Sequence, residues 1–455
     1  MMIETIGQEE YSRLAAAIDT PSPTSIRINS AKTDAEELSA MLSEAEPVKW
    51  CPDAFYLNER PQFTFDPLLH AGCYYVQEAS SMFLSKVLRH YAGERPVIAL
   101  DACAAPGGKS TLALSTLPQG SLLVANEYMR QRSQILAENL MKWGNPNIIV
   151  TNSDTKDFRS LPSFFDVIIC DAPCSGEGMF RKDDKAIEDW SIANVNLCQE
   201  RQREIIANLW QSLRPGGLFI YSTCTFNRQE DEENVQWMQE ELNAVRLSLP
   251  SLMEVEDASQ SIPNGHFYPH LVKGEGFFIS AFQKSEDEEE ETPRHKKKKK
   301  DQKGKSKSSK LPKEISQWIV QPELFTISKV SEGTFHAFPS CHADLLAQIA
   351  DATHIVHHGI QLATIKGKNL QPCHSLALSL SLNQEQFATA DLDYDQAIAY
   401  LRTEAITLPA GTPTGYVLVT YKNHPLGFVK NIGNRANNLY PSEWKIKSTF
   451  VPKMK

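Results

Sequence analysis

The segment from Val97 to Lys109, VIALDACAAPGGK, constrains the fold of this chain more than any other. It begins as an apolar strand over Val97–Leu100, continues into a loop of small residues over 104–108, and leads into a helix from about Lys109. Glycines let a ligand approach the backbone closely, and a helix N-terminus offers free N–H groups to a carboxylate or phosphate. The pattern predicts a ligand cradle, although two glycines alone would equally suit a tight strand-to-helix turn.

Residues 96–284 alternate short apolar segments with helical ones. The predicted strands are Val97–Leu100, Leu122–Asn126, Ile148–Thr151, Val167–Cys170, Leu218–Tyr221 and Phe277–Phe282, and the main predicted helices are Arg130–Trp143 and Ala186–Leu213. This alternation is typical of an α/β protein with a doubly wound parallel sheet, here with an antiparallel edge strand. In such sheets ligands bind at the carboxyl ends of the strands, where the strand order reverses.

Acids or thiols follow five successive predicted strands. In chain order they belong to Asp101 and Cys103, Glu127, Asp154, Asp171 to Cys174, and Ser222 to Thr225. Glu127 is placed to accept hydrogen bonds from ribose hydroxyls, and Asp154 could accept one from an adenine amino group. Either acid alone would also suit a helix cap or a turn, but the five strand ends together indicate a binding crevice.

Two of the nine cysteines, Cys174 and Cys224, fall in polar turns after the fourth and fifth predicted strands. A cysteine within an apolar segment is usually an inert core residue, and we interpret four others in this way: Cys51, Cys73, Cys170 and Cys198. A reactive thiolate is favoured near positive charge, which Lys109 could supply. Asn227 and Glu230 predict a capping box that opens a helix shortly after Cys224.

Four segments in this order, DACAAPGGKS, NSD, DAPCSGEGMF and YSTCTFNRQEDEENV, resemble successive motifs of the Sun/Nop family of RNA cytosine-C5 methyltransferases, and PHLVKGEGFF (Pro269–Phe278) is similar to a late motif. The resemblance implies a Rossmann-like S-adenosylmethionine-dependent methyltransferase fold. It implies Cys224 as the nucleophile and Cys174 as the cysteine that helps to release the product. The implied cofactor site consists of Cys103, Ala104, Ala105, Pro106, Gly107, Gly108, Lys109, Glu127, Asp154 and Asp171.

The implied chemistry gives two thiols separate tasks. Cytosine C5 is a poor nucleophile, so a thiolate must first add to C6. The C5 proton must then leave and the enzyme thiol must be eliminated, which a second polar group can assist. Asp171 and Lys109 could bind the edge of the base and stabilise charge on the ring. The target base must leave any stack to enter such a pocket. By spacing alone either cysteine could reach it, so the assignment of roles follows the resemblance.

Composition divides the chain into four parts. We predict an N-terminal RNA-binding subdomain over 1–95, a methyltransferase catalytic domain over 96–284, a disordered charged linker over 285–313 and a C-terminal domain over 314–455. The last part consists of short β-segments and resembles the RNA-binding, partly PUA-like region of the branch that methylates small-subunit ribosomal RNA. Its Cys-His pairs lack CxxC spacing, so we expect no metal site.

Overall composition limits the class of protein. No run of 18 apolar residues predicts a membrane span, and the N-terminus lacks a secretory pattern. Nine scattered cysteines suit the reducing cytoplasm rather than a disulfide framework. The net charge of −10 argues against nucleic acid as a partner, but a net charge can hide local basic patches.

We therefore expect a monomeric bacterial enzyme of the cytoplasm that makes 5-methylcytosine in 16S ribosomal RNA, either free or within the small ribosomal subunit. The same chemistry on transfer RNA is one alternative. Amino-group methylation would favour an Asn-Pro-Pro-aromatic loop where this chain has Asp171-Ala172-Pro173-Cys174. A ribosome-assembly factor that binds RNA without turnover is a further alternative, but it would need neither thiol.

Overall fold

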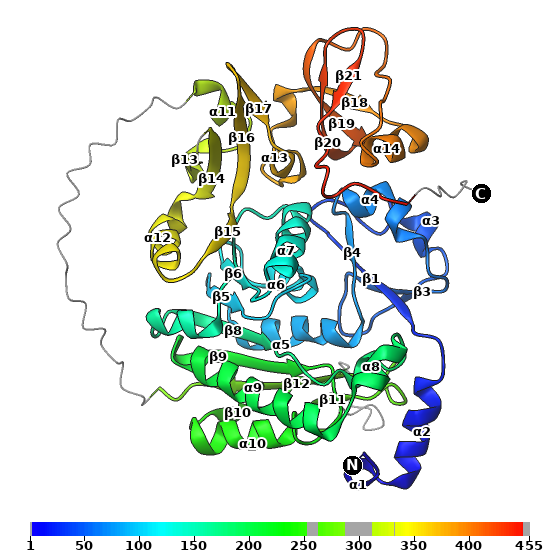
Figure 1. Cartoon of the computed structure of the whole chain (residues 1–455), viewed down its shortest axis with the longest axis vertical. Helices are drawn as coiled ribbons and strands as arrows, with labels where there is room; N and C mark the ends of the chain where they lie inside the picture. The colour runs from blue at the N-terminus through cyan, green and yellow to red at the C-terminus, as the bar shows by residue number, and fades with distance from the viewer. Residues whose placement is uncertain (1, 253–262, 287–311, 332, 449–455) are drawn as a thin grey trace, which may run out of the picture.

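The computed structural model describes residues 2–252, 263–286, 312–331 and 333–448, and Figure 1 shows their arrangement. The charged linker expected over 285–313 therefore lies almost entirely outside the described residues. No helix within these ranges is long and apolar enough to cross a membrane.

A mixed sheet forms the centre of the molecule, with the strand order β10-β12-β9-β8-β5-β6-β7-β15 and with β11 paired to β12 (Figure 1). Its parallel strands are β5 (Ile98–Asp101), β6 (Leu122–Asn126), β7 (Ile148–Thr151), β8 (Phe165–Asp171) and β9 (Leu213–Thr223). Its antiparallel strands are β10 (Val245–Leu247), β11 (His266–Phe267), β12 (Phe277–Gln283) and β15 (Ile355–His358). The α/β fold and its antiparallel edge strand are confirmed.

Helices cover both faces of this sheet because its parallel strands are apolar on both sides. One face packs against α5 (Leu84–Tyr91), α6 (Gly108–Thr116) and α7 (Arg130–Trp143). The other packs against α9 (Ile192–Trp210), α10 (Glu232–Glu241) and α12 (Ala343–Ala352). The central sheet is thus fixed between two packed layers of helices.

Two helix predictions differ from the structure. The single helix predicted over Ala186–Leu213 is wrong, because the chain forms α8 (Asp184–Asp189) and then α9, whose N-cap is Ser191. The Ser191 hydroxyl accepts a hydrogen bond from the Asn194 N–H at 3.2 Å, which starts the new helix. The predicted capping turn after Cys224 does form, since the Glu230 N–H donates to the Asn227 side chain at 2.9 Å, but α10 begins only at Glu232.

The N-terminal part contains a four-stranded antiparallel sheet of order β2-β3-β1-β4. Its elements are α1 (Met2–Ile6), α2 (Gln8–Ile18), β1 (Thr24–Ile28), α3 (Ser39–Leu42), β2 (Glu46–Pro47), β3 (Ala54–Leu57), α4 (Pro67–His70) and β4 (Tyr74–Val76), with 3-10 turns η1 (Phe63–Phe65) and η2 (Ser80–Phe83). The helix α5 that follows shares a core with Leu112 and Ala113 of α6, so this part packs directly on the central sheet.

The C-terminal part forms two further sheets, of orders β13-β14-β16-β17 and β18-β19-β20-β21. The first comprises β13 (Phe325–Ser331), β14 (Thr334–Pro339), β16 (Ile360–Lys366) and β17 (Asn369–Pro372), and the second β18 (Ala388–Asp391), β19 (Gly415–Tyr421), β20 (His424–Asn431) and β21 (Ala436–Asn438). Helices α11 (Lys313–Gln317), α13 (His374–Leu378) and α14 (Tyr394–Leu401) accompany them. The predicted β-rich character of this part is confirmed.

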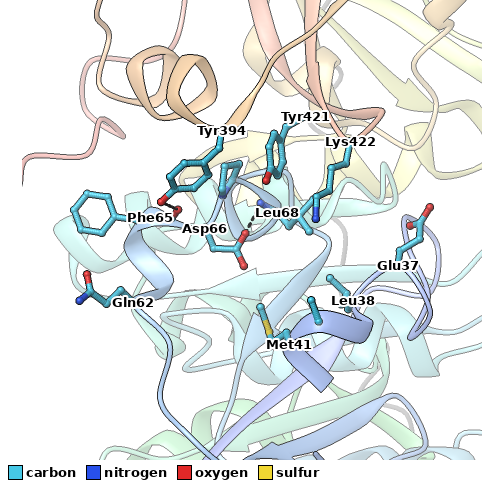
Figure 2. A pocket seen from close by; sticks show the side chains of 12 residues that line it. Glu37, Leu38, Met41, Gln62, Phe65, Asp66, Leu68, Tyr394, Tyr421 and Lys422 are labelled. Carbon is cyan, nitrogen blue, oxygen red and sulfur yellow. Dashed lines mark hydrogen bonds between the residues drawn. The ribbon is translucent and has the colours of Figure 1, made fainter. Parts of the chain in front are cut away.

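The two ends of the chain join the centre more closely than the sequence indicates. Strand β15 pairs antiparallel with β7 and so extends the central sheet from a segment about 200 residues later in the chain. The N-terminal and C-terminal parts also share one apolar cluster, and a pocket of about 290 Å³ lies at their contact (Figure 2). There the Tyr394 hydroxyl donates to the Phe65 carbonyl at 3.1 Å (Figure 2).

Buried histidines at the β15 joint predict a loss of stability in acid. Burial, with repulsion from His336, lowers the pKa of His357 to about 3 and that of His358 to about 4. The unfolded chain binds these protons near pH 6.5, so below that pH each histidine should reduce the free energy of unfolding by about 1.4 kcal/mol per pH unit until its folded pKa is reached.

Urea unfolding at several pH values between about 5 and 7.5 measures this slope. The slope of the free energy of unfolding against pH should be smaller in His357→Gln than in the wild type, by the equivalent of about one bound proton. Equal slopes for the two proteins would contradict the assignment.

Candidate active site

The strand order of the central sheet reverses between β5 and β8. Strand β5 pairs with β6 on one side and with β8 on the other, so the chain extends the sheet first from β5 towards β7 and then, from β8, in the opposite direction. Because β5 to β9 are parallel, the acids and thiols that follow them gather along one edge of the sheet. The structure thus brings together at one edge all of the strand ends from which the sequence predicted the site.

The loop between β5 and α6 is held in a fixed shape by α7. The Arg132 guanidinium donates to the Ala105 carbonyl at 2.7 Å, and the Asn139 amide donates to the Pro106 carbonyl at 2.8 Å. Gly107 caps α6 with a φ of +116°, a backbone conformation that strongly favours glycine. The first N–H groups of α6 have no acceptor within the helix, so this end of the cradle suits a carboxylate.

The two acids predicted to hold the nucleoside have partners within the protein. Glu127 is nearly buried and accepts a hydrogen bond from the Met129 N–H at 2.9 Å, with Arg132 at 3.5 Å from its other oxygen. Asp154 caps the 3-10 turn η3 (Thr155–Ser160) by accepting from the Lys156 N–H at 3.0 Å, which lowers its pKa. Asp154 therefore serves the local turn, and each carboxylate retains lone pairs for a ligand.

Asp101, at the end of β5, is one of the acids that the sequence placed at the strand ends, but the sequence assigned it no role. Its side chain is fully buried, and one oxygen accepts from the Ser110 hydroxyl of α6 at 2.6 Å while the other has no partner. Burial raises the pKa of Asp101 to about 7, and repulsion from Asp171 and Glu127 adds to the increase. A carboxylate in this position would be stabilised by a positively charged ligand.

This set of groups fits S-adenosylmethionine. Its sulfonium and ammonium groups match an acid-rich crevice, its ribose hydroxyls match carboxylate acceptors, and its carboxylate matches the start of α6. The unpartnered oxygen of Asp101 is the structural observation that most favours a cationic ligand. No group of three or more His, Cys, Asp or Glu side chains that could hold a metal ion occurs in the part of the chain that the structure describes.

Lys109 and Asp171 form the polar centre of the crevice. The Lys109 ammonium lies 2.8 Å from one Asp171 oxygen, and the Ser222 hydroxyl donates to the other at 2.8 Å. Burial would lower the pKa of Lys109, but the Asp171 carboxylate outweighs it and the pKa is raised. Lys109 is therefore an ammonium at neutral pH, and the Cys224 side chain lies close enough to add to this increase.

The two predicted thiols are in contact. The Cys174 and Cys224 sulfur atoms are 3.1 Å apart, because β8 and β9 pair in the register Asp171–Ser222 and their following turns meet. The pKa of Cys174 is raised well above its ordinary value by its hydrogen bond with Cys224, by burial and by the nearby Glu230 carboxylate. Cys170 is buried, as predicted, and its thiol contacts that of Cys103 in the cradle loop.

Comparison with known proteins agrees with this geometry. Family models match residues 87–283 as "16S rRNA methyltransferase RsmB/F", residues 1–79 as the N-terminal domain of 16S rRNA methyltransferase RsmF, and residues 387–446 as the methyltransferase RsmF PUA domain. The chain is 30% identical over 454 residues to ribosomal RNA small subunit methyltransferase F of Enterobacter sp. (strain 638), covering 95% of this chain and 92% of the relative. It is 31% identical over 448 residues to that of Cronobacter sakazakii, covering 94% and 91%.

Solved structures share the fold of the central part. A methyltransferase homolog from Pyrococcus horikoshii is 26% identical with a TM-score of 0.52, over 61% of this chain and 92% of that one. NSun6 from Pyrococcus horikoshii with SFG has a TM-score of 0.54 at 20% identity, over 63% of this chain and 97% of that one.

The sheet, the cradle and the family matches define an S-adenosylmethionine-dependent methyltransferase with a Rossmann-like fold. More particularly, the chain belongs to the RsmB/F family of 16S rRNA methyltransferases. The resemblance to Sun/Nop methyltransferases that the sequence motifs carry is confirmed.

The titration of Asp101 predicts how cofactor affinity depends on pH. If the ionised carboxylate faces the cationic cofactor, the wild type should gain affinity relative to Asp101→Asn as the pH rises through about 7. The ratio of the two affinities should increase about tenfold between pH values of about 6 and 8, because the ionised fraction of Asp101 increases by that factor. Calorimetry on both proteins measures the ratio, in which the cofactor's own titration cancels. A ratio that stays constant would place Asp101 outside the cofactor site.

Proposed function

We propose that this protein methylates C5 of a cytosine in 16S ribosomal RNA through a covalent bond between Cys224 and C6 of the base. The observation that carries the proposal is the contact between Cys174 and Cys224 in a crevice that also fits a sulfonium cofactor. The names of the family and of its relatives support 16S ribosomal RNA as the substrate. Simple RNA binding, as in an assembly factor, would not require two thiols in contact.

The electrostatics around the two thiols supports separate roles for them. Cys224 lies near the Lys109 ammonium. The pKa of Cys174 is raised by its hydrogen bond with Cys224, by burial and, less strongly, by the nearby Glu230 carboxylate. Cys174 therefore stays a protonated thiol, which leaves the attack on the base to Cys224.

Each residue then has a defined task in the reaction. Cys224 adds to C6, which makes C5 electron-rich. When bound, S-adenosylmethionine supplies an electrophilic methyl group. Asp171 and Lys109 hold the base edge and stabilise charge on the ring. After methylation a water molecule takes the C5 proton, the double bond between C5 and C6 re-forms and the C6–S bond breaks, so Cys224 leaves as a thiolate. The Cys174 thiol, 3.1 Å away, can donate a hydrogen bond to that thiolate. To reach the two thiols, the target nucleotide must leave its stack.

The remaining predicted residues complete this proposal. The loop from Cys103 to Lys109 cradles the methionine part of the cofactor, Glu127 binds the ribose hydroxyls, and Asp154 contacts the adenine. The parts over 1–95 and 314–455 bind RNA on either side of the catalytic domain over 96–284. The protein acts as a monomer in the cytoplasm, where the small-subunit RNA is made and assembled.

The two thiols should give different protein–RNA products. Cys224→Ala should abolish methylation and form no covalent adduct, because no thiolate remains to attack C6. Cys174→Ala should still attack and methylate but stall in elimination, so a conjugate stable to denaturing gel electrophoresis should accumulate. A conjugate that forms with Cys224→Ala and not with Cys174→Ala would reverse the two roles.

The choice of RNA can be tested in cells that lack the protein. Mass spectrometry of 16S ribosomal RNA from a deletion strain should show the loss of 5-methylcytosine at one or more positions. The wild-type gene should restore the modification and Cys224→Ala should not. Loss of 5-methylcytosine from transfer RNA, with 16S ribosomal RNA unchanged, would replace the substrate while leaving the chemistry in place.

A further inference from the structure

Two glutamates lie buried directly beside the turns that carry the thiols. Glu177 is 4% exposed and Glu230 is 0% exposed, although both belong to segments rich in polar residues. A buried carboxylate is costly unless hydrogen bonds compensate for the lost water. The donors that each glutamate uses therefore indicate what it does in the structure.

Glu177 begins the turn η4 (Glu177–Met179), three residues after Cys174, but its side chain binds the turn that carries Cys224. One of its oxygens accepts hydrogen bonds from the Thr225 hydroxyl at 2.8 Å and from the Phe226 N–H at 2.7 Å. Its other oxygen accepts from the Trp190 indole N–H at 3.0 Å. Glu177 thus fastens the two residues that follow Cys224.

Glu230 makes the reciprocal connection. It follows Cys224 in the chain, yet it accepts a hydrogen bond from the N–H of Ser175, the neighbour of Cys174, at 3.0 Å. The side chains of Asn227 and Gln202 donate to it as well, each at 2.7 Å. Gln202 in turn donates to the Pro173 carbonyl at 3.0 Å, so α9 holds the same turn.

Further bonds cross between the two turns. The hydroxyls of Ser175 and Thr225, the residues that follow the two cysteines, are 3.1 Å apart. The Gly178 N–H donates to the Cys224 carbonyl at 2.7 Å, and a Cβ added at Gly178 would lie 2.7 Å from that oxygen. No side chain fits at residue 178 without separating the turns.

We propose that Glu177 and Glu230 are positioning residues that clamp the two turns, and so the two thiols, against each other. We call this pair the glutamate clamp. It acts through the cysteines and need not touch RNA or cofactor. Its role in catalysis rests on the function proposed above, whereas its effect on the two thiols can be measured without RNA.

The hydrogen bond with Cys224 and burial are the main causes of the raised pKa of Cys174, and nearby charges add to them. The turn after β9 contributes the Glu230 carboxylate. The same turn carries Cys224, which lies opposite Cys174. On the crevice side the Lys109 ammonium of α6 is paired with Asp171 and lies near Cys224. Burial raises the pKa of Glu177, and hydrogen bonds from Thr225 and Phe226 oppose the increase. Removing the charge of Glu230 should therefore make Cys174 easier to ionise.

The first test measures the thiols alone. Dibromobimane links two thiols that lie close together, and peptide mass spectrometry identifies the linked pair. Glu177→Gln and Glu230→Gln should each reduce the yield of the Cys174–Cys224 link severalfold. Glu230→Gln should also move the pH midpoint of Cys174 alkylation down. Unchanged linking in both variants, together with an unchanged midpoint, would overturn the clamp.

The second test measures activity against matched controls. Both variants should lose methylation at least about tenfold, because small misplacements of reacting groups cost factors of this size. Asp166→Asn is the control for a hydrogen-bonded carboxylate on the same strand: Asp166 is half-buried at the opposite end of β8, accepts from the Ile98 N–H at 2.6 Å and pairs with Arg214. It should keep its thiol link and its activity, whatever it loses in melting temperature.

A milder pair of variants decides the question if the glutamine variants do not fold. Thr225→Val removes the hydroxyl's bonds with Glu177, Ser175 and Asn227, whereas Thr225→Ser keeps the hydroxyl. The clamp requires the valine variant to lose thiol linking and methylation and the serine variant to retain both. Equal behaviour of the two would overturn the clamp. In another outcome the wild type links its thiols but makes no 5-methylcytosine, while the clamp variants lose the link. That outcome would reject the RNA chemistry and leave the clamp in place.

Discussion

The parallel pairing of β8 with β9 is the constraint on which the rest of the site depends. The register Asp171–Ser222 ends both strands at the same edge of the sheet, so the turns that follow carry Cys174 and Cys224 into contact. Strand β9 is fixed on its other side by β12, which pairs antiparallel with it. Because β9 lies between two hydrogen-bonded neighbours, the point at which the Cys224 turn leaves the sheet is fixed.

Much of this arrangement could be predicted from the sequence, because the signals are local. The bounds of β6, β7 and α7 follow directly from short apolar segments and from one strongly helical stretch, and the structure has them at the predicted residues. Residues at the ends of parallel strands must share one edge of the sheet, and this rule is sufficient to predict that Glu127, Asp171 and the two thiols lie together. The family resemblance added the roles of these residues, which spacing alone left open.

The features that the sequence did not reveal depend on distant partners. Strand β15 joins β7 across about 200 residues, and no local pattern specifies that pairing. The acidic run after Asn227 resembles a solvated helix start, yet Glu230 and Asp231 are fully buried. Their burial is possible only because Ser175, Gln202 and Thr223 donate to them from other elements. Only the folded arrangement supplies these donors, so an acidic segment could not be recognised as part of the core.

The charge distribution also limits which part of an RNA can enter the crevice. Its edge carries several acids, and the cations beside them are paired: Lys109 with Asp171, and Arg132 with Glu127. Such an environment suits a cationic cofactor and a neutral base better than a phosphate. The net charge of −10 still leaves room for local basic surfaces, which suit phosphates better. Lys49, Lys86 and Arg89 line a cavity of about 590 Å³ in the N-terminal part. One acidic site can therefore hold both the sulfonium cofactor and the target base, because the base is the uncharged part of the RNA.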